Sequence, residues 1–117
     1  MNFPESDWKR LRSVHRAALE RYCARILDEC AVAMRDDTRS AHDRYLHVVR
    51  LLDERNGQVA SAFDDMRRST AIQRLAAMIS LGVVGGAELG QFTVATRESA
   101  TALAEMFAPS GKRPTAG

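Results

Sequence analysis

The stretch YLHVVRLLDERNGQVASAF, from Tyr45 to Phe63, carries the clearest periodic pattern in the chain. Its in-line positions follow one another at spacings of 4, 3, 4, 3 and 4 residues, and they are Tyr45, Val49, Leu52, Asn56, Val59 and Phe63. This spacing is typical of a helix that packs lengthwise against another helix. We therefore expect a long helix here, with the remaining helices arranged around it.

The dipeptide Asn56-Gly57 interrupts this stretch and is itself typical of a turn. The apolar positions nevertheless keep their phase on both sides of it, and no strand-like alternation flanks it. A glycine inside a helix costs about 1 kcal/mol relative to alanine, which the packing of Val59 and Phe63 offsets. The pattern favours one helix from about Ala41 to Arg67, kinked at Gly57, and a break at Asn56-Gly57 is the main alternative.

The composition fits one small globular domain. The chain has 117 residues, of which 45% are hydrophobic and 27% are charged. Prolines occur only at positions 4, 109 and 114, so none interrupts the interior of the chain. We expect a single helical domain over residues 1–109, followed by a disordered polar tail over residues 110–117.

A second long helix is predicted upstream, from Glu5 to Arg35, because its apolar residues fall in one band on a helical wheel. Both cysteines, Cys23 and Cys30, belong to that band, and we expect them to be buried thiols rather than a disulfide. The polar residues 36–40 form the turn to the next helix, with Thr38 or Ser40 as its N-cap. A connection this short makes the two long helices antiparallel neighbours.

Two shorter helices are predicted downstream. The third helix starts at Ser69 or Thr70, with a capping box between Thr70 and Gln73, and Gly82 ends it. A short helical turn over 87–91 follows. The last helix runs from Val94 to Phe107 behind a Thr93 cap. Its expected buried face is Val94, Ala95, Ala102, Leu103, Met106 and Phe107.

The expected fold is therefore all-α: a helical bundle with two long antiparallel helices plus a shorter third helix and a C-terminal helix. No segment is long and apolar enough for a membrane span, and the first ten residues lack the apolar core of a signal peptide. These features lead us to expect a cytoplasmic protein without a membrane partner.

The sequence contains no recognisable catalytic or metal-binding motif. His42 and His47 are five residues apart, whereas two ligands on one helix face need a spacing of three or four. The glycine-rich segment 82–90 lacks the Gly-Lys-Ser/Thr ending of a phosphate loop. We expect no catalytic, cofactor-binding or metal-binding residues and no cofactor. His15 lies on the apolar face of its helix and is the one candidate buried polar site.

Arginines give the first long helix a positive face. Arg10, Arg12, Arg21 and Arg25 share one sector of the helix, which we expect to lie opposite the buried band. Such a row of cations can contact nucleic-acid phosphates. The whole chain has 17 basic and 15 acidic residues, so its net charge of +2 does not by itself indicate nucleic-acid binding.

Several segments resemble a family of small bacterial all-helical proteins of unknown function. They are DWKRL at 7–11, YL at 45–46, AFDDMRRSTA at 62–71, ELGQF at 88–92 and TRE at 96–98. The resemblance covers most of residues 8–107. It implies a helical fold and carries no catalytic residue and no substrate.

The function that best fits these observations is a non-enzymatic helical interaction or scaffold protein that associates with itself. The long helices outrun what the shorter ones can cover, which predicts a homodimer through Tyr45, Val49, Leu52, Asn56, Val59 and Phe63. A polar residue in such a stripe tends to fix its register, and Asn56 has that position. An unidentified protein partner is a further possibility. The alternatives are a nucleic-acid-binding protein and an enzyme or metal protein with a site between subunits around His15.

Overall fold

The computed structural model describes residues 3–107, and it is all-α within that range. The helices are α1 (Glu5–Arg35), α2 (Ala41–Phe63), α3 (Ala71–Ser80), α4 (Gly86–Leu89) and α5 (Val94–Phe107), with a 3-10 turn η1 (Arg68–Thr70) before α3. The bounds predicted for the first and last helices are confirmed. The predicted polar tail over residues 110–117 lies outside the described residues.

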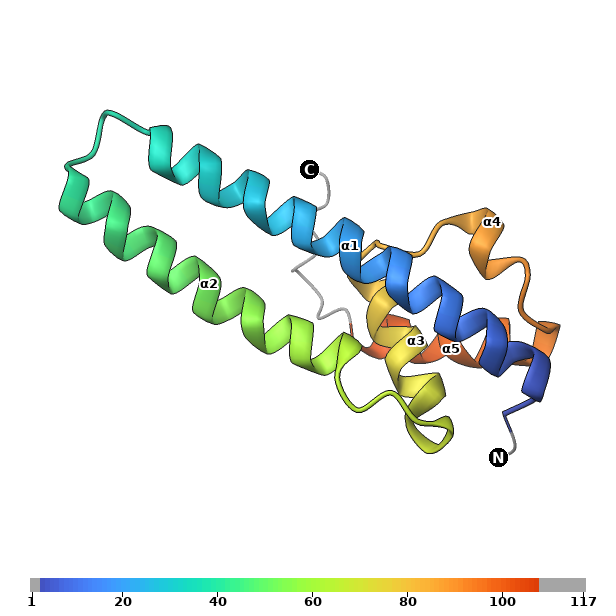
Figure 1. Cartoon of the computed structure of the whole chain (residues 1–117). Coiled ribbons are helices and arrows are strands. Elements are labelled where there is room, and N and C mark those ends of the chain that lie inside the picture. The colour runs from blue at the N-terminus through green and yellow to red at the C-terminus, as the bar shows by residue number, and fades with distance from the viewer. Residues whose placement is uncertain (1–2, 108–117) are drawn as a thin grey trace.

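An antiparallel hairpin of α1 and α2 forms the long axis of the molecule (Figure 1), whose extents are 52 × 26 × 22 Å. Ser40 caps α2, because its Oγ accepts a hydrogen bond of 3.0 Å from the backbone N–H of Asp43. The guanidinium of Arg44 donates to the carbonyl oxygen of Met34 at 2.8 Å and thereby satisfies an open carbonyl at the end of α1. The predicted short polar turn and Ser40 cap are confirmed.

Helix α2 is continuous through Asn56-Gly57, so a break at this dipeptide is wrong. Its predicted end at Arg67 is also wrong, since the helix ends at Phe63 and Asp65 adopts a left-handed backbone conformation with φ 57°. Arg74 of α3 donates to the carbonyl oxygens of Ser61 and Asp64 at 3.0 and 2.6 Å. These bonds satisfy carbonyls at the end of α2, so a residue distant in sequence stabilises this earlier stop.

Helices α3 and α5 pack together on one half of the hairpin and leave its other half uncovered (Figure 1). The buried residues of α3 include Leu75 and Met78, both without exposed surface. The predicted capping box of this helix is wrong. Thr70 Oγ1 instead accepts from the backbone N–H of Arg67 and donates to the carbonyl oxygen of Asp65, and Gln73 is exposed.

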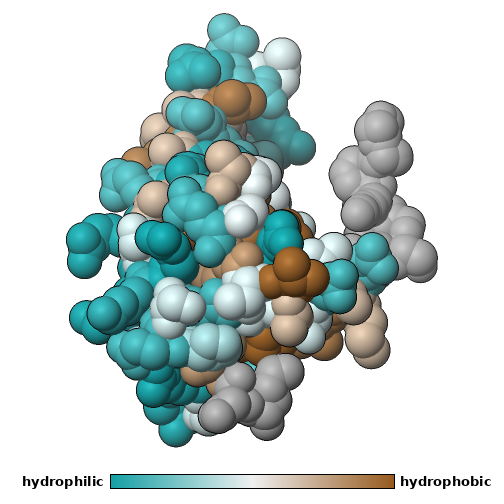
Figure 2. Space-filling view, turned by 90° about the vertical axis from the view of Figure 1, so that its right-hand side faces the viewer, coloured by the Kyte–Doolittle hydropathy of each residue, from teal (hydrophilic) through white to brown (hydrophobic). Residues whose placement is uncertain are grey.

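The buried face of α5 differs from the predicted one. Its small residues Thr96, Ala100 and Ala104 are buried, whereas Val94, Met106 and Phe107 are exposed. Small side chains at a spacing of four let α5 approach α3 closely, which outweighs the burial of the larger apolar side chains. Seen from the end of the molecule that carries these helices, hydrophobic groups lie between hydrophilic ones (Figure 2).

A buried carboxylate joins the start of α1 to the start of α5. Asp7 is 1% exposed, and its oxygens accept hydrogen bonds from the backbone N–H of Thr93 (2.9 Å), the hydroxyl of Thr93 (2.7 Å) and the hydroxyl of Thr96 (2.6 Å). Burial by itself raises the pKa of Asp7, but the hydrogen bonds from Thr96 and Thr93 outweigh it and hold this pKa below its ordinary value. The first turn of α1 therefore fixes the position of α5.

The loop between α3 and α5 follows the prediction in part. Gly82 has φ 75°, the left-handed conformation expected of the glycine that ends a helix. Helix α4 covers Gly86–Leu89 rather than the predicted 87–91, and Phe92 behind it is buried. Of the two thiols, Cys30 is buried as expected and Cys23 is exposed, which corrects the prediction for Cys23. Within residues 3–107, no helix combines the length and the hydropathy that crossing a membrane requires.

Candidate interaction surface

The uncovered half of the hairpin exposes large apolar side chains. Leu27 and Met34 of α1 are 67% and 54% exposed. Tyr45, Val49 and Leu52 of α2 are 64%, 39% and 38% exposed. Together with the exposed Asn56, these five residues define what we call the hairpin face. The hairpin face, with Asn56 counted, includes four of the six residues in the predicted stripe.

These residues lie on one side of the hairpin. In α1, Leu27 and Met34 each follow a buried residue by one position, and in α2 Leu52 follows the buried Leu51. A step of one residue turns an α-helix by about 100°. In an antiparallel pair of right-handed helices, the residue that directly follows a contact residue points to the same side of the pair in both helices. Leu27, Met34 and the stripe of α2 therefore share a surface.

Helices α3 and α5 lie on the opposite side. Arg21 and Arg25 each precede a buried residue of α1, and their guanidinium groups donate to carbonyl oxygens after α3, those of Val83 (2.8 Å) and Leu81 (2.6 Å). From α2, Gln58 and Ser61 line a groove together with residues of α3. Within residues 3–107, α3, α5 and the loop after α3 therefore do not cover the hairpin face.

The C-terminal end of the stripe belongs to the core. Phe63 is 5% exposed and Val59 is half-buried. The stripe is thus exposed from Tyr45 to Asn56 and buried at its C-terminal end, where the Phe63 ring contacts His15 and Tyr22 of α1. Asn56 is exposed in the single chain, so it reaches a buried contact only if a partner covers the hairpin face.

Polar contacts fix the register of the hairpin. The Arg55 guanidinium donates two hydrogen bonds to the Glu29 carboxylate, at 2.8 and 3.0 Å, and the hydroxyl of Tyr22 donates to the side chain of Gln58. The hydrogen bond from Arg55 lowers the pKa of Glu29, and the same contact raises the pKa of Arg55. Bidentate pairing of this kind favours a defined geometry, so it sets which levels of α1 and α2 lie side by side.

The arginine row does not form one free face. Arg21 forms a bidentate ion pair with Glu88 at 2.7 and 2.8 Å, and Arg25 donates to the carbonyl oxygens of Leu81 and Gly82. The hydrogen bond from Arg21 lowers the pKa of Glu88. Only Arg10 and Arg12 of the four are exposed without a hydrogen bond or ion pair among the described residues. The sequence did not reveal which arginines contact other parts of the chain, because it does not show that the segment 81–88 lies beside α1.

We expect Arg21→Ala to loosen the segment from Val83 to Glu88, because it removes the contacts that join this segment to α1. Hydrogen exchange followed by mass spectrometry should show faster amide exchange there and unchanged exchange in α2. Arg12→Ala is the matched control and should leave both segments unchanged. Equal exchange in the two variants would contradict a role for Arg21 in holding this segment.

His15 is a partly buried core histidine. Its Nε2 lies 3.0 Å from the carbonyl oxygen of Phe63, and its ring meets the Phe63 ring edge to face with centroids 5.5 Å apart. A carbonyl oxygen only accepts hydrogen bonds, so Nε2 carries a proton. This contact ties α1 to the end of α2. Among residues 3–107, no group of three or more histidine, cysteine or acidic side chains is placed to hold a metal ion.

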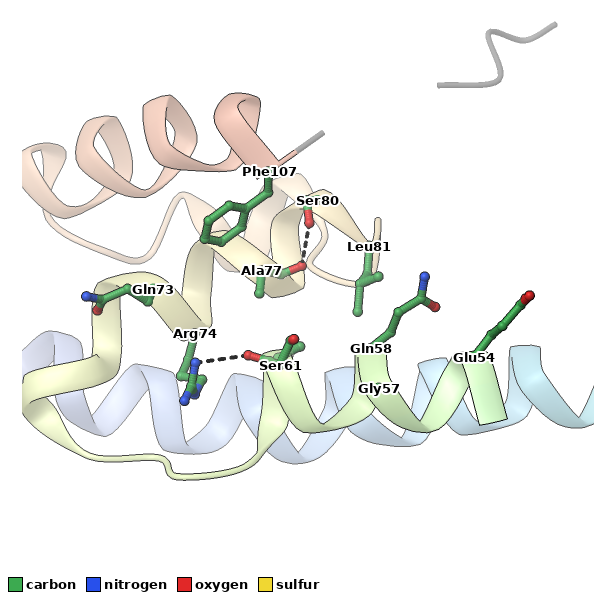
Figure 3. A pocket seen from close by; sticks show the side chains of 11 residues that line it. Glu54, Gly57, Gln58, Ser61, Gln73, Arg74, Ala77, Ser80, Leu81 and Phe107 are labelled. Carbon is green, nitrogen blue, oxygen red and sulfur yellow. Dashed lines mark hydrogen bonds between the residues drawn. The ribbon is translucent and has the colours of Figure 1, made fainter. Parts of the chain in front are cut away.

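A groove of about 760 Å³ lies between α2 and α3, with Phe107 at its edge (Figure 3). Its lining mixes apolar side chains such as Leu81 with polar ones such as Gln73. Arg74 and Ser80 in this lining donate to carbonyl oxygens of the chain itself, those of Ser61 and Ala77. Within the described residues, the groove contains no nucleophile next to a base, so its geometry indicates no reaction.

Comparison of the chain with protein-family models, with curated proteins and with solved structures finds no match. The resemblance to small bacterial helical proteins therefore stays a prediction. Asp7 is the residue of structural importance that the sequence did not reveal. Its one signal is an acidic residue at the start of a helix, which is equally typical of an exposed helix end.

Proposed function

We propose that this chain is a non-enzymatic helical interaction protein that associates with itself through the hairpin face. The observation that carries the proposal is the grouping of Leu27, Met34, Tyr45, Val49 and Leu52 on one side of a protruding hairpin. Single exposed apolar side chains are ordinary, but a contiguous group of them is typical of an interface.

A second copy is the partner that the spacing favours. Tyr45, Val49, Leu52 and Asn56 follow one another at intervals of 4, 3 and 4 residues, which is the spacing with which helices interlock in coiled coils. The chain has a net charge of only +2, so repulsion between copies is small. The two free cysteines further support a reducing, cytoplasmic location for this association.

The nucleic-acid alternative loses its support, because Arg21 and Arg25 are used in contacts within the chain. The alternative of a site between subunits around His15 is weakened in the same way. His15 is partly buried and contacts the carbonyl oxygen of Phe63, in the core rather than on the hairpin face.

Leu52→Asp tests the proposal. An aspartate in the middle of a paired face would bury a charge without a partner, so we expect a dimer to become a monomer at the same concentration. Multi-angle light scattering behind size-exclusion chromatography measures this mass. Circular dichroism of the variant should remain helical, because Leu52 is 38% exposed in the single chain.

Val32→Asp is the matched control. Val32 is a 62% exposed apolar residue of α1, but it precedes the buried Ala33 and thus lies on the other side of the hairpin. This variant should remain a dimer. The proposal is wrong if the unmodified chain is a monomer at about micromolar concentration and above, or if both variants weaken the dimer equally.

A further inference from the structure

We propose that two copies pair with their hairpins running in opposite directions. A two-fold axis would cross the hairpin face between Val49 and Leu52 on α2 and between Leu27 and Met34 on α1. This inference rests on the proposed self-association and adds the arrangement of the two copies. An interface around a two-fold axis must be complementary to itself, and the hairpin face meets that requirement.

The stripe of α2 is symmetric about its own midpoint. Val49 and Leu52 lie at equal distances on either side of a point between residues 50 and 51, and Tyr45 and Asn56 lie at equal larger distances. An axis through this point places Val49 against Leu52 of the second copy. It likewise places Tyr45 against Asn56 of the second copy, and both contacts occur twice.

The exposed residues of α1 share the same axis. The midpoint of Leu27 and Met34 lies between residues 30 and 31. Because α1 and α2 are antiparallel, the residues of α2 beside residues 30 and 31 can be found by counting from a known contact. Counting from the Tyr22–Gln58 contact gives residues 49 and 50. Counting from the Glu29–Arg55 pair gives residues 53 and 54. The midpoint of the α2 stripe, between residues 50 and 51, lies within this interval. One axis therefore places Leu27 against Met34 of the second copy as well.

Asn56 distinguishes this arrangement from the alternative in which the two hairpins run in the same direction. If the hairpins ran in the same direction, each α2 would face α1 of the other copy. The same two counts would then place Asn56 beside residues 24 to 28 of that α1, where Leu27 is the residue of the hairpin face. Its amide would then be covered by an apolar side chain without a hydrogen-bond partner, which is unfavourable. With the hairpins in opposite directions, the hydroxyl of Tyr45 reaches the amide of Asn56 and satisfies it.

Disulfide formation between single-cysteine chains tests the arrangement. In a Cys23→Ser/Cys30→Ala background, one chain carries Tyr45→Cys and a second chain of different mass carries Asn56→Cys. The two are mixed, left to exchange subunits and oxidised. We expect about tenfold more mixed disulfide than either homodisulfide, because pairing raises the effective concentration of the two thiols.

The expected pattern follows from the distances. Two copies of position 45 would lie about 16 Å apart along the helix, given 11 residues between positions 45 and 56 and 1.5 Å per residue. A disulfide cannot span that separation. A mixture of Tyr45→Cys with Ser61→Cys, on the α3 side of the hairpin, is the matched control and should give only background.

Each other result overturns the inference in a recognisable way. A dimer that links Asn56→Cys to Leu27→Cys rather than to Tyr45→Cys has hairpins in the same direction, so the arrangement is wrong and self-association stands. Equal yields from the Tyr45→Cys mixtures with Asn56→Cys and with Ser61→Cys exclude the proposed contact. If light scattering shows that both the unmodified chain and the Cys23→Ser/Cys30→Ala chain are monomers, the proposed arrangement and the proposed function are both wrong.

Discussion

Replacing Phe63 with alanine is expected to lower the free energy of unfolding by about 3–5 kcal/mol, the usual cost of removing a buried phenylalanine side chain. Phe63 is 5% exposed and contacts two residues of α1. Its ring meets His15 edge to face and lies 6.3 Å from the ring of Tyr22, measured between centroids. The substitution would leave a cavity between α1 and the end of α2.

Thermal and urea unfolding followed by circular dichroism measure this effect. Tyr45→Ala is the matched control, because Tyr45 belongs to the same stripe but is 64% exposed. Under conditions in which both variants are monomeric, its unfolding free energy should change by less than about 0.5 kcal/mol. A similar loss in both variants would contradict the division of the stripe into a buried and an exposed end.

Asp7→Ala is expected to lower the free energy of unfolding by about 2–3 kcal/mol, because it leaves the buried hydroxyl of Thr96 and the partly buried donors of Thr93 without an acceptor. Unfolding should remain cooperative, and its midpoint should fall by roughly 10 °C or more in a domain of this size. Hydrogen exchange should rise most in α5, whose first turn loses its hydrogen bonds to α1.

Glu5→Ala is the matched control for Asp7→Ala. Both residues are acidic and lie in the first turn of α1, but Glu5 is exposed and pairs with Arg68 at the surface. Surface ion pairs contribute little, so this variant should unfold within a few degrees of the unmodified chain. Equal destabilisation by the two variants would mean that the charge at the start of α1, and not the contact with α5, is what matters.

The pH dependence of the Asp7 effect has a definite sign. Folding lowers the pKa of Asp7, so its contribution to stability is complete above the unfolded-state pKa of about 4 and is lost as the pH falls through the lower folded-state value. The difference in stability between the unmodified chain and Asp7→Ala should therefore be constant near neutral pH. It should shrink only below about pH 4.

The helices could be predicted well from the sequence because their signals are local. The polar turn at 36–40, the cap at Thr93 and the glycine at position 82 act through neighbouring residues, and the predicted bounds of α1 and α5 agree with the structure. The end of α2 could not be predicted in this way. It depends on Arg74, which satisfies the carbonyl oxygens of Ser61 and Asp64 from another helix.

Periodicity alone also misassigned which side of a helix is buried. In α5 the larger apolar residues, such as Met106, are exposed and the small residues, such as Ala100, are buried. Hydrophobicity ranks single residues, whereas burial in α5 depends on how closely its backbone approaches α3. The same limitation applies to Cys23, which lies on the apolar band of α1 but just beyond its contact with α2.

The all-α class, the two long antiparallel helices and the stripe from Tyr45 to Phe63 follow from local sequence alone, because helix propensity and periodicity are properties of neighbouring residues. Three further features depend on long-range packing. Phe63 is core while Tyr45, Val49 and Leu52 are exposed. Arg21 and Arg25 hold a loop, and Asp7 joins α1 to α5. Each of these outcomes depends on which distant segment lies beside the residue. That placement is set by the packing of α3 and α5 on one side of the hairpin, which leaves the other side as the proposed interface.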